Sequence, residues 1–142
     1  MTGFLLDTNI PSELTRPQSD PRVEKWLDDV DDELLYLSVV SLGEILKGVT
    51  ILPPSKRRKE LEQWIDGVLR PWFDGRILPV TEGIAERWGT LAGECQTKGR
   101  GLAVADGLIA ATALEHDLTV VTRNVRDFDG LGVGVFNPWS MQ

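Results

Sequence analysis

Cysteine and histidine are almost absent from this sequence, which has one of each, Cys95 and His116, among 142 residues. A single cysteine excludes an intrachain disulfide and a zinc site built on cysteines. With one isolated histidine and one isolated cysteine, Ser–His and Cys–His catalytic arrangements are also poor candidates. The chemistry of this protein is therefore expected to rest on other polar groups.

Long apolar segments are absent too. No apolar run approaches the roughly 20 residues that a membrane-spanning helix needs. The N-terminus lacks the basic region of a signal peptide and reaches the acidic Asp7 at once. The sequence therefore predicts a cytoplasmic protein without a membrane segment.

Positive charge is the scarcer sign, with 15 Lys and Arg against 22 Asp and Glu and a formal net charge of −7. This balance argues against binding nucleic acid through overall charge, although it leaves room for local basic patches beside an acidic site. The remaining proportions, 42% hydrophobic and 26% charged residues, are those of a globular protein. At this length, residues 1–142 are expected to form a single domain with a real core.

Short apolar runs alternate with amphipathic segments along the chain. Apolar runs bounded by turn residues are typical of buried parallel strands, and apolar residues spaced 3, 4 and 7 apart are typical of helices. Pro71 is expected to kink or end the helix that contains it. The alternation predicts a parallel sheet of about five strands with helices on both faces, a three-layer α/β/α fold. Strands are predicted at 3–6, 33–40, 75–80, 119–122 and 130–136, and helices at 9–15, 21–30, 41–52, 55–72, 82–98 and 103–116.

Asp7 directly follows the first predicted strand and precedes Thr8. Two interpretations of this position are open. Asp7 or Thr8 caps the next helix, or Asp7 lies at the carboxyl end of a parallel strand, where ligands bind in open α/β sheets. Further acids at equivalent strand ends would favour the second interpretation.

Two further acids lie in predicted helices. Glu44 follows the second strand, but Ser41-x-x-Glu44 also fits a capping box, which needs no chemistry. Asp106 lies on a stripe of small apolar residues, where an ionised carboxylate is costly unless it is paired or binds a metal. Arg100 is the candidate partner that lies nearest in sequence. The pattern favours a functional role for Asp106 and leaves both interpretations open for Glu44.

Asn124 and Asp127 follow the fourth predicted strand. By itself an Asn-x-x-Asp segment is a common turn, with Asp127 as its cap. Together with the earlier acids it completes a set of polar groups at the ends of strands one, two and four. Converging carboxylates raise one another's pKa values, and a hard cation such as Mg²⁺, which prefers oxygen ligands, removes that penalty. A water activated by the cation is then suited to attack a phosphodiester.

Taken in order, these segments resemble the PIN-domain nucleases, and within them the VapC-like and FitB-like toxins of bacterial toxin–antitoxin modules. The resemblance covers nearly the whole chain, and its last segment, Asn137-Pro138-Trp139, is FitB-like. The other matching segments are Leu5-Leu6-Asp7-Thr8-Asn9, Ser41-x-x-Glu44-Ile45-x-x-Gly48, Ala105-Asp106-x-x-Ile109-Ala110-Ala111-Thr112-Ala113 and Val121-Thr122-Arg123-Asn124-x-x-Asp127-Phe128.

The resemblance implies a PIN-like fold and a Mg²⁺- or Mn²⁺-dependent endoribonuclease that cleaves RNA phosphodiester bonds with a metal-activated water. It implies metal ligands at Asp7, Glu44 and Asp106. The fourth family position falls on Asn124, which carries no charge, and Asp127 either is the compensating acid or only braces the loop.

Neighbouring residues receive supporting roles from the same resemblance. Thr8 would orient Asp7 or a metal-bound water, and Asn124 would accept a hydrogen bond or ligate through its amide oxygen. Arg123 and Arg126 lie beside the acids that follow strand four, which makes them candidate contacts to substrate phosphate.

The resemblance also implies a cognate antitoxin that inhibits the nuclease, and binding to operator DNA only through that antitoxin. A homodimer is expected, paired with the antitoxin into a heterotetramer or a larger complex. Because Asn124 supplies no charge, one alternative stays open: a weakly or non-catalytic PIN module that acts with its antitoxin as a DNA-binding autoregulatory complex. A phosphatase of the haloacid-dehalogenase type is disfavoured, because it needs a second acid two residues after Asp7, where this sequence has Asn9.

Overall fold

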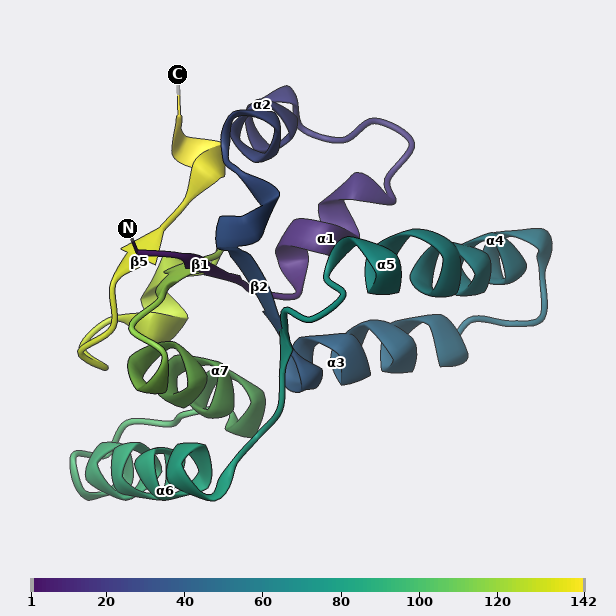
Figure 1. The fold of residues 1–142 in the computed structure, drawn as a ribbon. Helices are drawn as coiled ribbons and strands as arrows, with labels where there is room; N and C mark the ends of the chain where they lie inside the picture. The colour runs from purple at the N-terminus through teal and green to yellow at the C-terminus, as the bar shows by residue number, and fades with distance from the viewer. Residues whose placement is uncertain (1, 142) are drawn as a thin grey trace.

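The computed structural model describes residues 2–141, and its centre is a sheet of five parallel strands in the order β3-β2-β1-β4-β5. Helices cover both faces of this sheet (Figure 1). The predicted three-layer α/β/α fold with about five parallel strands is therefore confirmed. The strands are β1 (Phe4–Leu6), β2 (Leu35–Ser38), β3 (Ile77–Leu78), β4 (Thr119–Val121) and β5 (Val135–Phe136).

The helices divide between the two faces. α7 packs on one face and α6 packs against α7, whereas α1 to α5 belong to the opposite layer (Figure 1). Three short 3₁₀ turns, named η1, η3 and η4, connect elements within the described part of the chain. The helices are α1 (Asn9–Leu14), α2 (Pro21–Asp29), α3 (Val39–Thr50), α4 (Lys56–Trp64), α5 (Arg70–Trp72), α6 (Glu82–Thr97) and α7 (Val104–Glu115), and the turns are η1 (Asp32–Leu34), η3 (Val125–Phe128) and η4 (Pro138–Ser140).

Side chains alternate along the strands and divide the core into two parts. Leu6, Leu37 and Val121 pack with the layer of α1 to α5, whereas Leu5 and Val120 pack with α7. All five are fully buried. Leu6 pairs in register with both Leu37 and Val121, so the ends of the three strands lie within one residue of one another. The residues that follow them are thereby brought to one edge of the sheet.

β1 lies where the growth of the sheet changes direction. From β1 the chain adds β2 and β3 on one side, and then crosses over to add β4 and β5 on the other. The crossing segment contains α6 and α7, which is why α7 covers the face opposite to α1–α5. In open α/β sheets, ligands bind outside the carboxyl ends of the strands at such a point.

The boundary between β2 and α3 differs from the prediction. Ser38 caps α3, because its hydroxyl accepts a hydrogen bond from the backbone N–H of Val40 at 3.0 Å. Ser41 is fully buried within the helix, and Glu44 lies in the second helical turn. The predicted capping box of Ser41 and Glu44 is therefore wrong.

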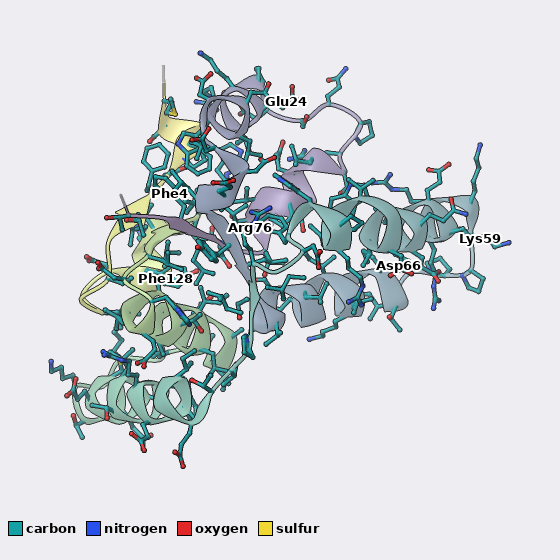
Figure 2. All side chains as sticks on the ribbon, viewed as in Figure 1. Phe4, Glu24, Lys59, Asp66, Arg76 and Phe128 are labelled. Carbon is teal, nitrogen blue, oxygen red and sulfur yellow. The ribbon has the colours of Figure 1, made fainter. Side chains whose placement is uncertain are left out.

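The predicted helix 55–72 is one helical segment with an irregular turn inside it. α4 passes into a π-helical turn, η2 (Ile65–Leu69), and then into α5, which contains Pro71 and ends at Trp72. Proline has no N–H to donate to the preceding turn, and π-type turns accommodate such interruptions. α3 and α4 form a hairpin that extends away from the sheet, with Lys59 in its outer part (Figures 1 and 2). Across residues 2–141, no helix is long and apolar enough to cross a membrane.

Candidate functional site

Asp7 is buried at the carboxyl end of β1, with 6% of its surface exposed. Its backbone N–H donates to the carbonyl of Val121 at 2.9 Å and so extends the pairing of β1 with β4. One carboxylate oxygen accepts a hydrogen bond from the backbone N–H of Thr8 at 2.8 Å. The other accepts from the Thr122 hydroxyl at 2.8 Å and from the Asn9 side-chain amide at 3.3 Å. Every one of these donors is neutral.

Thr122 and Asn9 hold the Asp7 carboxylate, and the sequence did not single out either residue for this task. The Thr122 hydroxyl also accepts from the Asn9 amide at 3.2 Å and from the backbone N–H of Asn124 at 3.0 Å. The Asn9 amide oxygen accepts from the backbone N–H of Arg123 at 3.3 Å. Thr122 could have been found from the sequence, because it directly follows a buried apolar strand. A hydroxyl buried at such a position must find hydrogen-bond partners.

Thr8 connects Asp7 to Glu44. It occupies the N-cap position of α1, but its side chain makes no cap hydrogen bond. Its hydroxyl instead donates to a carboxylate oxygen of Glu44 at 2.6 Å, while its backbone N–H holds Asp7. Neither of the predicted helix-capping roles explains this arrangement, which brings the ends of β1 and α3 together.

Burial and neighbouring carboxylates raise the pKa values of Asp7 and Asp106. Burial raises the pKa of Asp7, hydrogen bonds from Thr122 and Thr8 act against that rise, and the charges of Glu44 and Asp127 add to it. Partial burial in the first turn of α7 raises the pKa of Asp106 to about 6, with further contributions from the charges of Asp7, Asp127 and Glu44. The four carboxylates therefore lie within electrostatic reach of one another.

Arg100 does not neutralise Asp106. Its guanidinium donates to the backbone carbonyls of Asp129, Arg126 and Asp127, and so ties the loop before α7 to η3. Among the ion pairs between residues 2 and 141, none includes Asp7 or Asp106. The site thus gathers negative charge without a cationic side chain paired to it.

This donor set suits a hard divalent cation. Carboxylate oxygens are the ligands that Mg²⁺ and Mn²⁺ prefer, and a buried carboxylate with only neutral partners, such as Asp7, gains from a neighbouring cation. Within the described residues, no three Asp, Glu, His or Cys side chains form a ready-made metal-binding group. The residues therefore offer the oxygen ligands that the ion prefers, but the described side chains are not arranged as a complete set of ligands.

The candidate residues that follow β4 lie in different surroundings. Asn124 and Asp127 are both exposed, and Asp127 donates its backbone N–H to the carbonyl of Asn124 at 3.1 Å within η3. Arg123 lies over the ring of Trp139, with 5.4 Å from its guanidinium carbon to the ring centroid. Arg126 lines a hollow together with Asp106 and Asp127. The two candidate phosphate contacts thus point into different surroundings.

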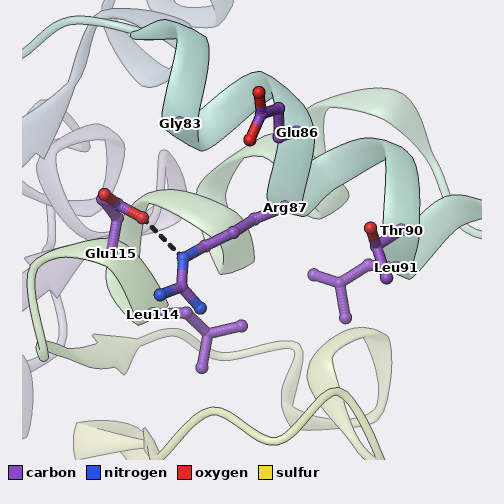
Figure 3. A pocket seen from close by; sticks show the side chains of 7 residues that line it. All are labelled: Gly83, Glu86, Arg87, Thr90, Leu91, Leu114 and Glu115. Carbon is purple, nitrogen blue, oxygen red and sulfur yellow. Dashed lines mark hydrogen bonds and ion pairs between the residues drawn. The ribbon is translucent and has the colours of Figure 1, made fainter.

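A larger hollow lies elsewhere, between α6 and α7. Its volume is about 470 Å³, and Leu91 and Leu114 contribute to its lining. Arg87 crosses it to bind Glu115 at 2.5 Å (Figure 3). This hollow contains none of the carboxylates gathered at the strand ends, so size alone does not identify the functional site.

A family model described as the PIN domain matches residues 4–132. The chain therefore belongs to the PIN-domain family, and its resemblance to the FitB-like and VapC-like toxins is confirmed by individual relatives. It is 43% identical to toxin FitB of Neisseria gonorrhoeae over 136 residues, which cover 96% of this chain and 98% of FitB.

A second relative and a solved structure agree with this assignment. The chain is 36% identical to VapC ribonuclease Y4jK of Sinorhizobium fredii over 136 residues, or 96% of this chain and 97% of the relative. A structure of FitAB bound to the IR36 DNA fragment matches with a TM-score of 0.91 and 41% identity, and the match covers 98% of this chain and 97% of its counterpart.

Proposed function

We propose that this protein is an endoribonuclease toxin that depends on Mg²⁺ or Mn²⁺ and is inhibited by a cognate antitoxin. The observation that carries the proposal is the buried Asp7 carboxylate, which has only neutral hydrogen-bond partners and lies within electrostatic reach of three further acids. The similarity to the relative named VapC ribonuclease Y4jK supports RNA as the substrate.

Asp7, Asp106, Glu44 and Asp127 are the residues that would hold the divalent cation. When bound, the cation supplies a Lewis acid for phosphodiester hydrolysis and charge to neutralise the phosphoryl oxygens. Asp7 comes from the end of β1 and Asp106 from the first turn of α7. Asn124 is exposed, its backbone N–H donates to the Thr122 hydroxyl that holds Asp7, and its amide oxygen would be a further ligand.

The protein's own hydrogen bonds determine how these acids are presented. Thr122 and Asn9 hold one oxygen of Asp7, and the Thr8 N–H holds the other. The Thr8 hydroxyl restrains Glu44. The donors to Asp7 favour its ionised form and so act against the effect of burial, and the contacts together hold the Asp7 and Glu44 side chains in place.

We propose the antitoxin as the principal protein partner, with operator DNA bound only through it. The match to FitAB bound to a DNA fragment supports this arrangement. We further propose that residues 1–142 are a single PIN domain, which forms a homodimer and, with the antitoxin, a heterotetramer or larger complex. The match of the family model to residues 4–132 supports the single domain.

The direct test compares RNA cleavage by wild type and by Asp7→Asn, Asp106→Asn and the control Asp74→Asn, each with about 5 mM Mg²⁺ or Mn²⁺. Asp74 is exposed and lies outside the site. We expect at least about a hundredfold loss of cleavage in the two site variants and no change in the control. Circular dichroism shows whether the variants remain folded. Full cleavage by folded Asp106→Asn would contradict the proposed mechanism.

A weakly or non-catalytic module that acts with its antitoxin on DNA is the second candidate. Two observations favour it: Asn124 brings no charge to the site, and residues 2–141 contain no ready-made group of three metal ligands. Calorimetric titration with Mn²⁺ separates the two candidates. The nuclease should bind Mn²⁺ with a loss of affinity in Asp7→Asn, whereas the non-catalytic module should bind none.

A further inference from the structure

Arg126 lies within η3 and Arg123 lies two residues before η3, and the two side chains face different surroundings. Arg123 lies over the Trp139 ring of η4 at 5.4 Å. Its charge also acts on Asp20 at the start of α2, whose pKa is lowered to about 2 mainly by hydrogen bonds from Arg22. Arg123 is therefore directed toward the segment of η4 and α2.

Arg126 lines a hollow of about 190 Å³ with the acids Asp106 and Asp127 and the loop 100–103. Within residues 2–141, its guanidinium makes no hydrogen bond or ion pair with the protein. Arg100 lines the same hollow, but its guanidinium is occupied by backbone carbonyls. Of the two arginines that line this hollow, Arg126 is thus the one with donors available.

The backbone under Arg126 is held in place. Arg100 donates to the carbonyls of Arg126 at 3.5 Å and of Asp127 at 3.4 Å. Phe128, the last residue of η3, is buried in the core. A guanidinium on an anchored turn loses less conformational entropy when it binds an anion than one on a mobile loop does.

We propose that Arg126, in the hollow beside Asp106, binds the RNA phosphate next to the one that is cleaved, a proposal that rests on the nuclease function above. Four carboxylates converge here and repel a polyanionic strand, so a neighbouring cation is needed to hold it. A phosphate is present at every step of an RNA strand, and arginine binds phosphate through paired N–H donors. The assignment makes Arg126 a substrate-binding residue, whereas Arg123 has a structural role beside η4 and α2.

The experiment measures initial rates on a fluorescently quenched RNA 20-mer pool of mixed sequence, with Mg²⁺, for wild type, Arg126→Ala, Arg126→Lys and Arg123→Ala. Arg126→Ala should raise KM about tenfold with kcat nearly unchanged, because the contact is equally strong in the ground and transition states. Arg126→Lys should keep most of the affinity, since it retains the charge. Arg123→Ala is matched in charge and should change KM less than about twofold.

Two further measurements test that the contact is to a phosphate. The slope of log KM against log salt concentration should fall by about 0.7 in Arg126→Ala, the value for one contact on a single strand. Affinity for a single-stranded DNA 20-mer pool, measured by fluorescence anisotropy, should fall by a similar factor, because the phosphate is shared by both polymers. A loss confined to RNA would overturn the phosphate assignment.

The outcomes distinguish this proposal from the proposed function. If wild type cleaves the RNA and Arg126→Ala has an unchanged KM and salt slope, the Arg126 proposal is wrong and the nuclease stands. Equal losses in Arg123→Ala and Arg126→Ala would also overturn it, because they would report overall charge. Wild type that binds both strands but cleaves neither contradicts the nuclease, and an Arg126 effect on binding would then still support the phosphate contact. Wild type that binds neither strand contradicts both.

Discussion

Replacing Asp106 by Asn should stabilise the metal-free protein at neutral and alkaline pH. The folded protein raises the pKa of Asp106 from 3.8 to about 6 through partial burial and the charges of Asp7, Asp127 and Glu44. In a fully buried group, a shift of this size would correspond to about 3 kcal/mol. Because Asp106 is only partly buried, solvent screening reduces the expected effect to about 1 kcal/mol. The amide side chain of the Asp106→Asn variant has nearly the same shape as the carboxylate but carries no charge.

The stability difference between wild type and Asp106→Asn should depend on pH. Since the folded-state pKa lies above the unfolded value of 3.8, wild type carries no charge penalty below pH 3.8 and loses stability as the pH rises through 6. The two proteins should therefore have similar melting temperatures near pH 3. Above about pH 7, Asp106→Asn should melt about 3 °C higher.

The assay is thermal unfolding by circular dichroism in EDTA, at intervals from about pH 3 to 8, with Asp74→Asn as an exposed control. Mg²⁺ should then raise the melting temperature of wild type more than that of Asp106→Asn, because only wild type keeps all four candidate ligands. Equal melting temperatures at pH 8 would refute the argument that burial and the neighbouring acids penalise the ionised Asp106 carboxylate. A difference that is unchanged at pH 3 would show that the charge is not its cause.

Substitutions at Thr122 and at Gly107, the latter compared with Gly48, test the scaffold of the site. Thr122→Val removes the hydroxyl that binds Asp7 and the Asn124 N–H, and should lower the free energy of unfolding by about 2 kcal/mol. Thr122→Ser keeps a hydroxyl and should lower it by less than about 1 kcal/mol. Denaturant titration measures both values, and equal losses would exclude the hydroxyl as the cause. Gly107→Ala places a methyl group 2.7 Å from the Trp88 ring and should destabilise by about 1 to 2 kcal/mol, whereas Gly48→Ala in α3, with no atom within 4 Å, should stabilise by about 0.5 kcal/mol. Stabilisation by both alanines would contradict the close packing of α6 on α7.

The alternation of strands and helices is sufficient to predict the fold, but not every boundary. The apolar segment up to Val40 predicts a strand throughout, because Val39 and Val40 are β-branched and favour strands. In the structure Ser38 caps α3, and both valines belong to the helix. The strand preference of the two valines is overridden here by the Ser38 cap. Which residue becomes the cap depends on where the pairing of β2 ends.

The candidate site could likewise be predicted only in part. Asp7 and Asp106 could be predicted, because an acid at a strand end or on an apolar helix face conflicts with its surroundings. Asn9 and Thr122 could not, since they are 113 residues apart and meet only when β1 pairs with β4. The different surroundings of Arg123 and Arg126 depend on the turn of η3, which sequence spacing does not specify.

The topology also distributes the acids between two halves of the chain. Asp7 and Glu44 precede the exposed prolines Pro53 and Pro54, whereas Asp106 and Asp127 follow them. A chain break between these prolines would leave each fragment with half of the carboxylates, and with one of the two strands whose pairing brings Asn9 to Thr122. Neither fragment alone would assemble the four-acid site, so the proposed RNA cleavage, if recovered in a mixture of the two, would report their reassociation.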